Sequence, residues 1–225
     1  MNCQSIRREN RWTMLNSIVS TYQPDVIHLT ETHLDKNISS SEILQGNPNY
    51  DIIRKDRTSY GGGVMIMTHK KYVSTHETSL DTNCEVIWNK ISLVGCRPLY
   101  TASYYRPPNS TIQHLEELEA SIYRIPKNGL LNIVITGDFN LPGINWDDES
   151  YTLPSQPEYG TGINTKLLDI ISDNDFTQCI KEPTREQNIL DLILTTTPDL
   201  VKNVHTLDGM SDHRAVMCDI NLKAR

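Results

Sequence analysis

The sequence predicts an α/β fold in which β-sheets stack on one another and helices cover the outside. Nine segments have strand character, whereas three show helical periodicity. Several strands are apolar almost without a break, as in VMIM, NIVIT and LDLIL, which is typical of sheets covered on both faces. A chain of 225 residues can bury roughly 70% of the surface that it exposes when unfolded, enough for a large layered core. We expect one domain over residues 1–225, because no repeat or linker divides the chain.

Three helices are predicted from apolar residues at helical spacing. The first covers residues 5–23 and is closed by Pro24. The other two cover residues 111–125 and 164–174. Each is amphipathic, so each is expected to lie outside the sheets with one buried side.

The nine predicted strands are short runs of β-branched and apolar residues bounded by turn residues. In chain order they are residues 25–32, 50–55, 62–68, 85–94, 99–106, 132–140, 190–196, 202–207 and 215–222. The least regular stretch is 141–162, which is rich in Pro, Gly, Asp and Tyr. A long loop of this kind is a place where function can reside.

Composition excludes several classes of protein. The net charge of −7 argues against a broad basic face that clamps nucleic acid. It does not exclude a nuclease, because a cation held by carboxylates can itself meet the scissile phosphate. Five scattered cysteines without a CxxC pair argue against a disulfide framework and a zinc knuckle. There is no membrane-spanning run, signal peptide or visible targeting signal, so we expect an intracellular protein.

The polar residues of interest lie at strand ends. The strand NIVIT runs into Asp138 and Asn140, with Gly137 allowing a sharp exit. Asp138 and Asn140 point the same way if the extended conformation persists, and together they could activate a water and hold a phosphate oxygen. The tripeptide alone is more simply explained as a turn.

A second group of polar residues lies in the last third of the chain. Asp191 lies inside an apolar strand, where a carboxylate needs a partner. His213, in the run Ser211–Asp212–His213, is the obvious partner, and the two would form an orienting pair. Taken singly, this histidine is more often a surface or core residue, and Ser-Asp is a turn.

Three further candidates come from the first half of the chain. Glu31 ends a strand as a hard oxygen ligand for Mg²⁺, and Tyr105 could donate a hydrogen bond to phosphate. Asn2 is either a ligand or a helix-start signal. For Glu31 alone, a solvent-facing residue at a strand end is the simpler explanation. For Tyr105, an aromatic strand capped by a proline turn is an equally simple one.

Each of these motifs is weak alone, but their order along the chain is specific. The series NCQS, TET, YYRPPN, GDFN, ILDLIL and SDH resembles the endonuclease/exonuclease/phosphatase superfamily of DNase I-like enzymes over essentially the whole chain. The likeness is strongest to the endonuclease domain of non-LTR (LINE-type) retrotransposons, through NCQSI, RKDR followed by GGGV, and YRPP. It implies a four-layered α/β sandwich, with two packed mixed β-sheets flanked by helices.

The resemblance also implies a site and a reaction. It brings together Asn2, Glu31, Tyr105, Asp138, Asn140, Asp191, Asp212 and His213. Glu31 would hold Mg²⁺, for which Mn²⁺ can substitute, with Asp212 or Asn2 nearby. Asp138 would position or deprotonate the attacking water, with Asn140 steadying it, and His213 and Tyr105 would contact the phosphate. One departure is Pro108, which stands where many relatives have an asparagine.

We therefore expect a metal-dependent endonuclease that nicks double-stranded DNA, with access to the nucleus. If the chain is part of a longer polyprotein, its partner would be that polyprotein's reverse transcriptase region. The alternatives are a phosphatase or lipid phosphodiesterase of the same fold, or a catalytically inactive binding homologue. The loops 141–162 and 195–202 are expected to flank the scissile phosphate.

Overall fold

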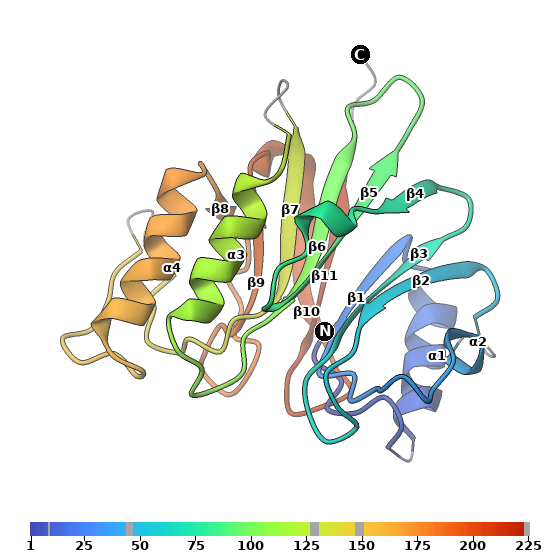
Figure 1. Ribbon diagram of the computed structural model, residues 1–225, viewed down its shortest axis with the longest axis horizontal. Coiled ribbons are helices and arrows are strands. Elements are labelled where there is room, and N and C mark those ends of the chain that lie inside the picture. The colour runs from blue at the N-terminus through green and yellow to red at the C-terminus, as the bar shows by residue number, and fades with distance from the viewer. Residues whose placement is uncertain (9, 44–46, 127–130, 147–150, 223–225) are drawn as a thin grey trace.

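The computed structural model describes residues 1–8, 10–43, 47–126, 131–146 and 151–222. Its helices and sheets lie in four layers (Figure 1). One outer layer holds α3 (Gln113–Tyr123) and α4 (Thr161–Asp173), and the other holds α1 (Arg11–Tyr22) and α2 (Ser40–Ile43). None of the helices in the described part of the chain has the length and apolar character needed to cross a bilayer.

Two layers of β-structure lie between the helices. The sheet beside α3 and α4 has the order β4 (Val73–His76), β5 (Glu85–Ser92), β6 (Leu99–Tyr105), β7 (Asn132–Asp138), β9 (Asp191–Thr195), β8 (Thr177–Gln178). The layer beside α1 contains β1 (Val26–Thr30), β3 (Val64–His69) and β2 (Tyr50–Lys55), together with the pair β10 (Val201–Leu207) and β11 (Ala215–Ile220). Short 3₁₀ turns occupy Thr78–Leu80 and Pro198–Leu200.

An apolar cluster lies in each gap between these layers. Leu118 and Leu167 of the outer helices belong to one cluster with Trp88 and Ile135 of the large sheet. On the other side, Leu15 of α1 belongs to a cluster with Leu29 and Met67 of the smaller layer. Between the layers of strands, Val134 and Ile193 cluster with Val26, Val216 and Cys218, among others. Strands buried on both faces, such as β3 and β9, are therefore mostly apolar, as their sequences indicate.

The pairing of β6, β7 and β9 positions the chemistry of the molecule. β6 and β7 are parallel and are joined through α3, whereas β7 and β9 are antiparallel. The carboxyl end of β7 and the amino end of β9 therefore lie at the same edge of the sheet. Asp138 stands directly opposite Asp191 in this ladder.

The first helix begins later than its periodicity indicates. The pattern predicts a start at Ser5, but α1 starts at Arg11. The preceding residues instead run along the end of β1, where the amides of Cys3 and Ser5 donate to the carbonyls of Thr30 and Glu31 at 3.0 and 2.8 Å. Hydrogen bonds to a distant segment thus override the local helical pattern. The short elements α2, β4 and β8 are not predicted by the sequence, because segments of two to four residues show no readable period.

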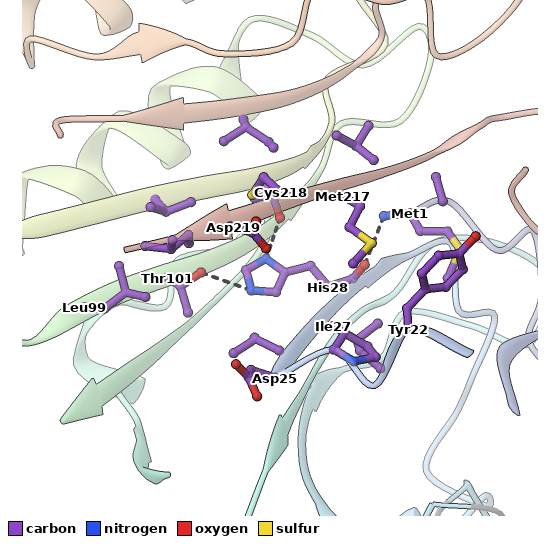
Figure 2. Close-up of a pocket in the computed structure, with 18 of the residues that line it drawn as sticks. Met1, Tyr22, Asp25, Ile27, His28, Leu99, Thr101, Met217, Cys218 and Asp219 are labelled. Atoms are coloured by element: carbon purple, nitrogen blue, oxygen red, sulfur yellow. Dashed lines mark hydrogen bonds between the residues drawn. The ribbon is translucent and has the colours of Figure 1, made fainter. Parts of the chain in front are cut away.

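His28 of β1 lies half-buried between the two layers of strands, where it lines a cavity of about 630 Å³ (Figure 2). Its ring nitrogens lie 2.5 Å from the hydroxyl of Thr136 and 3.0 Å from that of Thr101. Burial, followed by the positive amino terminus, lowers the pKa of His28 from 6.5 to about 3. The ring is therefore neutral in the folded protein at neutral pH.

This depressed pKa predicts an acid-labile fold. Because the folded-state pKa lies below the unfolded value of 6.5, the stabilisation is complete above that pH and is lost as the pH falls toward about 3. A shift of this size corresponds to a loss on the order of 4 kcal/mol. Urea denaturation at pH 7.0, 5.5 and 4.5 measures it. His28→Gln should be less stable at pH 7 but should lose less stability on acidification, and equal pH slopes for the two proteins would contradict the assignment.

Candidate active site

The candidate site is built on the edge where β7 ends and β9 begins. Gly137, just before Asp138, pairs with Tyr104 on one side and Leu192 on the other. A Cβ at Gly137 would come within 1.8 Å of the Tyr104 carbonyl oxygen, so only glycine allows β6 to approach β7 here. The role of Gly137 is therefore close packing within the ladder, rather than the sharp exit expected from the sequence.

Asp138 is fully buried at the centre of the site. One carboxylate oxygen accepts a hydrogen bond from the Asn2 amide at 3.0 Å and lies 3.9 Å from Nε2 of His213. The other accepts the backbone N–H of Asn140 at 3.0 Å. Burial, reinforced by the negative charge of Asp191, raises the pKa of Asp138 to about 8.

Glu31 lies beside Asp138 at the end of β1. Its Oε1 accepts the Tyr105 hydroxyl at 2.7 Å and the Asn2 amide at 3.3 Å, and its Oε2 lies 3.3 Å from Nε2 of His33. Burial and the nearby Glu31 charge raise the pKa of Tyr105 far above its ordinary value, so the phenol stays a donor. The Asn2 side chain thus bridges the carboxylates of Glu31 and Asp138.

Asp191 and His213 form the predicted pair. Nδ1 of His213 lies 2.7 Å from Oδ2 of Asp191, and both side chains are buried. Burial lowers the pKa of His213, but the hydrogen bond to Asp191 and the charges of Asp191 and Asp138 outweigh it, and the net change is upward. The loop that carries His213 is fixed by Ser211, whose hydroxyl donates to the Asn2 carbonyl at 2.9 Å.

Asn140 reaches the site by a different route from the one expected. The strand ends at Asp138, and Asn140 has a positive φ of 50°. Its side-chain amide donates to the Arg106 carbonyl at 2.9 Å. The extended conformation therefore does not persist, and Asn140 contacts Asp138 through its backbone N–H.

Asp212 stands at the rim. Its carboxylate accepts Gln4 Nε2 at 2.9 Å and pairs with Arg185 at 2.7 Å, and its side chain is 43% exposed. The structure thus links seven of the eight expected residues by direct contacts: Asn2, Glu31, Tyr105, Asp138, Asn140, Asp191 and His213. Asp212 joins them through Gln4, whose backbone N–H donates to Asn2 Oδ1 at 3.0 Å.

Three residues at the site are missed by reasoning from the sequence. His33 was readable in principle, because it stands two residues after Glu31 at the end of the same strand. Gln4 and Arg185 carry no such signal, because each meets Asp212 only through the fold. Asn109, which directly follows Pro108, lies exposed in the turn after Arg106.

The charges at the site fit a bound cation. Ligand atoms of Asp138, Asp191 and His213 lie within 4.8 Å of one another, and Oδ1 of Asp191 is buried without a hydrogen-bond partner. The carboxylate of Glu31 joins this group through Asn2. The carboxylates of Glu31, Asp138 and Asp191 share the site with two imidazoles, His33 beside Glu31 and His213 beside Asp191. Burial, reinforced by the charge of Asp191, raises the pKa of Asp138. Carboxylate oxygens are the ligands preferred by hard divalent cations.

One of the two loops expected to flank the site lies elsewhere. Because β9 runs antiparallel to β7, the loop 195–202 leaves from the edge opposite Asp138, where the Thr196 amide donates to the Ile133 carbonyl at 3.2 Å. The expectation that this loop flanks the phosphate is wrong. Instead, the turn 185–188 reaches the site. An isolated antiparallel bridge joins Arg185 and Asn188, and Arg185 forms an ion pair with Asp212.

The other loop does leave directly from the site, after Asn140. Its described part faces the segment that carries the 185–188 turn across a hollow of about 680 Å³. Gly143 and Trp146 line one side of the hollow, and Lys181 and Gln187 line the other. Two loops from different parts of the sequence therefore border this hollow.

Known proteins share this architecture. The model of a family described as endonuclease-reverse transcriptase matches residues 99–217. No curated protein sequence matches the chain. Among solved structures, the endonuclease domain of TRAS1, a telomere-specific non-LTR retrotransposon, is 18% identical with a TM-score of 0.73, and the alignment covers 99% of this chain and 96% of that domain.

Two further structures have the same fold. An AP endonuclease from Archaeoglobus fulgidus is 15% identical with a TM-score of 0.75, covering 98% of this chain and 97% of the enzyme. The 3′ phosphatase NExo from Neisseria, bound to a product DNA hairpin, is 16% identical with a TM-score of 0.65, covering 97% and 96%. At these identities the likeness establishes the DNase I-like fold. With the family model matching more than half of its length, the chain belongs to the endonuclease-reverse transcriptase family.

Proposed function

We propose that this protein is a Mg²⁺-dependent endonuclease that nicks double-stranded DNA and leaves a 5′-phosphate and a 3′-hydroxyl. The observation that carries the proposal is the continuous network from Glu31 through Asn2 and Asp138 to His213 and Asp191. It joins a carboxylate suited to a cation, a buried base and an oriented imidazole within one edge of the sheet. The family of this chain and its structural likeness to the TRAS1 endonuclease domain support a nucleic-acid substrate.

Glu31 would hold the cation, with Asn2 beside it. Asp212, at the rim of the site, would be a further ligand. Bound Mg²⁺, or Mn²⁺ in its place, would supply positive charge to the scissile phosphate and to the leaving oxygen. The Asp212 carboxylate can turn inward only after leaving Gln4 and Arg185. An arginine released in this way could pair with a phosphate of the DNA.

Asp138 would take the proton of the attacking water. Its burial strengthens it as a base, and Asn140 fixes its orientation through the backbone N–H. His213, held by Asp191 and more readily protonated than a free histidine, would donate from Nε2 to a phosphate oxygen as charge develops. Tyr105, whose phenol stays protonated, orients Glu31 and offers a second donor.

The biological setting we propose is the target-nicking step of a non-LTR retrotransposon. The 3′-hydroxyl left by the nick would prime a reverse transcriptase region of the same polyprotein, which requires access to nuclear DNA. The TRAS1 domain, whose origin is such an element, supports this setting. NExo is a 3′ phosphatase with the same fold, so release of phosphate is the competing activity.

Metal dependence provides the first test of the function. Nicking of supercoiled plasmid should vanish in EDTA and return with Mg²⁺, because few basic side chains meet the phosphate. Glu31→Gln should raise the Mg²⁺ concentration needed for half-maximal nicking by about tenfold or more. Glu116→Gln, on the exposed face of α3, is the matched control. Nicking in excess chelator would refute the metal assignment, and phosphate release without nicking would favour the phosphatase.

Catalytic substitutions form the second test. Asp138→Ala and His213→Ala should each reduce kcat by on the order of 10² or more, because each removes a transition-state interaction. Asp191→Asn should cost less, since it leaves an imidazole in place with a weaker orienting partner. His205→Ala, on exposed β10, controls for loss of a histidine. A His213→Ala protein that nicks at the parental rate with an unchanged melting curve would show that the network does not carry the reaction.

A third test concerns the choice of nick site. Glu186 and Gln187 form the exposed tip of the 185–188 turn, and Glu186 has a positive φ of 50°. Replacing both with Asn-Gly, which suits such a turn, should redistribute the nicks while keeping the overall rate within about tenfold. The same replacement of Pro198 and Asp199, at the opposite edge, should leave the distribution unchanged. The nick positions made on one plasmid by the parent and by the two variants are compared by sequencing. Identical patterns from all three proteins would mean that the 185–188 turn does not contact DNA.

A further inference from the structure

The run RKDR and the following GGGV are prominent in the sequence, yet the proposed network uses none of their residues. In the structure, Arg57 from the first motif and the glycines 61–63 from the second form one turn before β3. Arg57 Nε donates to the Gly61 carbonyl at 3.0 Å, and the Thr58 hydroxyl donates to the same carbonyl at 3.3 Å. The two motifs therefore fold as a single unit.

A buried carboxylate closes this turn. Glu85, the first residue of β5, is 7% exposed. One of its oxygens accepts the backbone N–H of Gly63, and the other pairs with Arg57 Nη1 at 2.7 Å. Together, Arg57, residues 61–63 and Glu85 form what we call the glycine clamp.

The glycines of the clamp are required by close approach on both sides. Gly62 and Gly63 have positive φ values of 71° and 90°. A Cβ at Gly62 would come within 2.6 Å of the Glu85 carboxylate and would overlap the Arg57 guanidinium. A Cβ at Gly63 would overlap the hydroxyl of Thr32, just after β1. The turn therefore has an ion pair against one side and the exit of β1 against the other.

The clamp holds the segment that carries Glu31. The Thr32 amide donates to the Gly63 carbonyl at 3.2 Å. The His33 amide donates to the Gly62 carbonyl at 2.9 Å. Glu31 and His33 have positive φ values of 54° and 51°, and residues other than glycine keep this conformation only where their surroundings enforce it. The clamp supplies two such contacts directly after Glu31.

Glu85 also lies beside the hydrogen-bond donor of Glu31 in the large sheet. In the β5–β6 ladder Glu85 stands directly opposite Tyr105, whose hydroxyl donates to Glu31 at 2.7 Å. The guanidinium of Arg57 lies 5.8 Å from the centre of the Tyr105 ring. Arg57 is needed here for its charge as well, because an unpaired Glu85 would add its negative charge to that of Glu31.

We propose that Glu85 and Arg57 are positioning residues for Glu31, which they hold through the glycine turn. The proposal rests on the proposed function, in which Glu31 binds the cation. In the described part of the chain, neither side chain hydrogen-bonds to Asp138 or His213. Loss of the ion pair should therefore weaken cation binding more than it slows the chemical step.

The test is Glu85→Gln, which keeps an acceptor for Gly63 but removes the charge that holds Arg57. The amides of Thr32 and His33 should exchange at least about tenfold faster by NMR, because the carbonyls that they meet are no longer fixed. The dissociation constant for Mn²⁺, measured by calorimetry without DNA, should rise about fivefold or more. The Mg²⁺ concentration for half-maximal nicking should rise by a similar factor, and by more than kcat falls.

Glu119→Gln is the matched control, because it breaks a partly buried ion pair with Lys166 between the outer helices α3 and α4. It should leave both the exchange and the Mn²⁺ affinity within about twofold of the parent. Arg57→Gln, at a side chain that is 40% exposed, repeats the test if the Glu85 variant does not fold. Arg57→Lys keeps the charge and should restore most of the Mn²⁺ affinity.

Unchanged exchange and Mn²⁺ affinity in the variants of the clamp would overturn the proposal. So would faster exchange with unchanged affinity, because the clamp would then hold the chain without positioning the ligand. Equal effects of Glu119→Gln would overturn it as well, by assigning them to general stability. Faster exchange in the variants of a parent that binds no Mn²⁺ would refute the proposed metal site while supporting the hold of the clamp on β1.

Discussion

The structure depends on one unfavourable arrangement, the placement of two carboxylates opposite each other on buried neighbouring strands. Asp138 and Asp191 are directly paired across β7 and β9, and both are buried. Like charges at this distance cannot both remain ionised without compensation. His213 supplies it on the side of Asp191, Asn2 supplies a donor on the side of Asp138, and a cation would supply the rest. The fold thus concentrates negative charge at one edge of a rigid sheet, where the proposed function would bind a cation.

Asn2 connects the two halves of the molecule. Its side chain touches a carboxylate from each layer of strands, Glu31 from β1 and Asp138 from β7, while its carbonyl accepts the Ser211 hydroxyl. The relative position of the sheets therefore sets the distance between the proposed metal ligand and the proposed base. Packing between the sheets and catalysis are coupled through this one amide.

An acidic protein that cuts DNA is physically reasonable with this site. The net charge of −7 disfavours binding driven by many phosphate contacts. In the proposed function, charge at the scissile phosphate would instead be local, from a cation and from the histidine, and the bordering loops would recognise the shape of the duplex. The Arg185–Asp212 pair at the rim offers a cationic side chain that can exchange a carboxylate for a phosphate.

The sequence by itself determined the fold class, the nine main strands and the Asp191–His213 pair, because alternation, continuous apolar runs and a lone carboxylate in a strand are local signals. It also indicated Glu31, Tyr105 and Asp138 as neighbours, but only as a set of motifs in a characteristic order. Tertiary structure decided what depends on strand direction and distant partners. The antiparallel pairing of β9 moved the loop 195–202 to the opposite edge and brought the 185–188 turn to the site. The start of α1 at Arg11, the turn at Asn140 and the rim position of Asp212 each follow from hydrogen bonds to segments far along the chain, which no local pattern encodes.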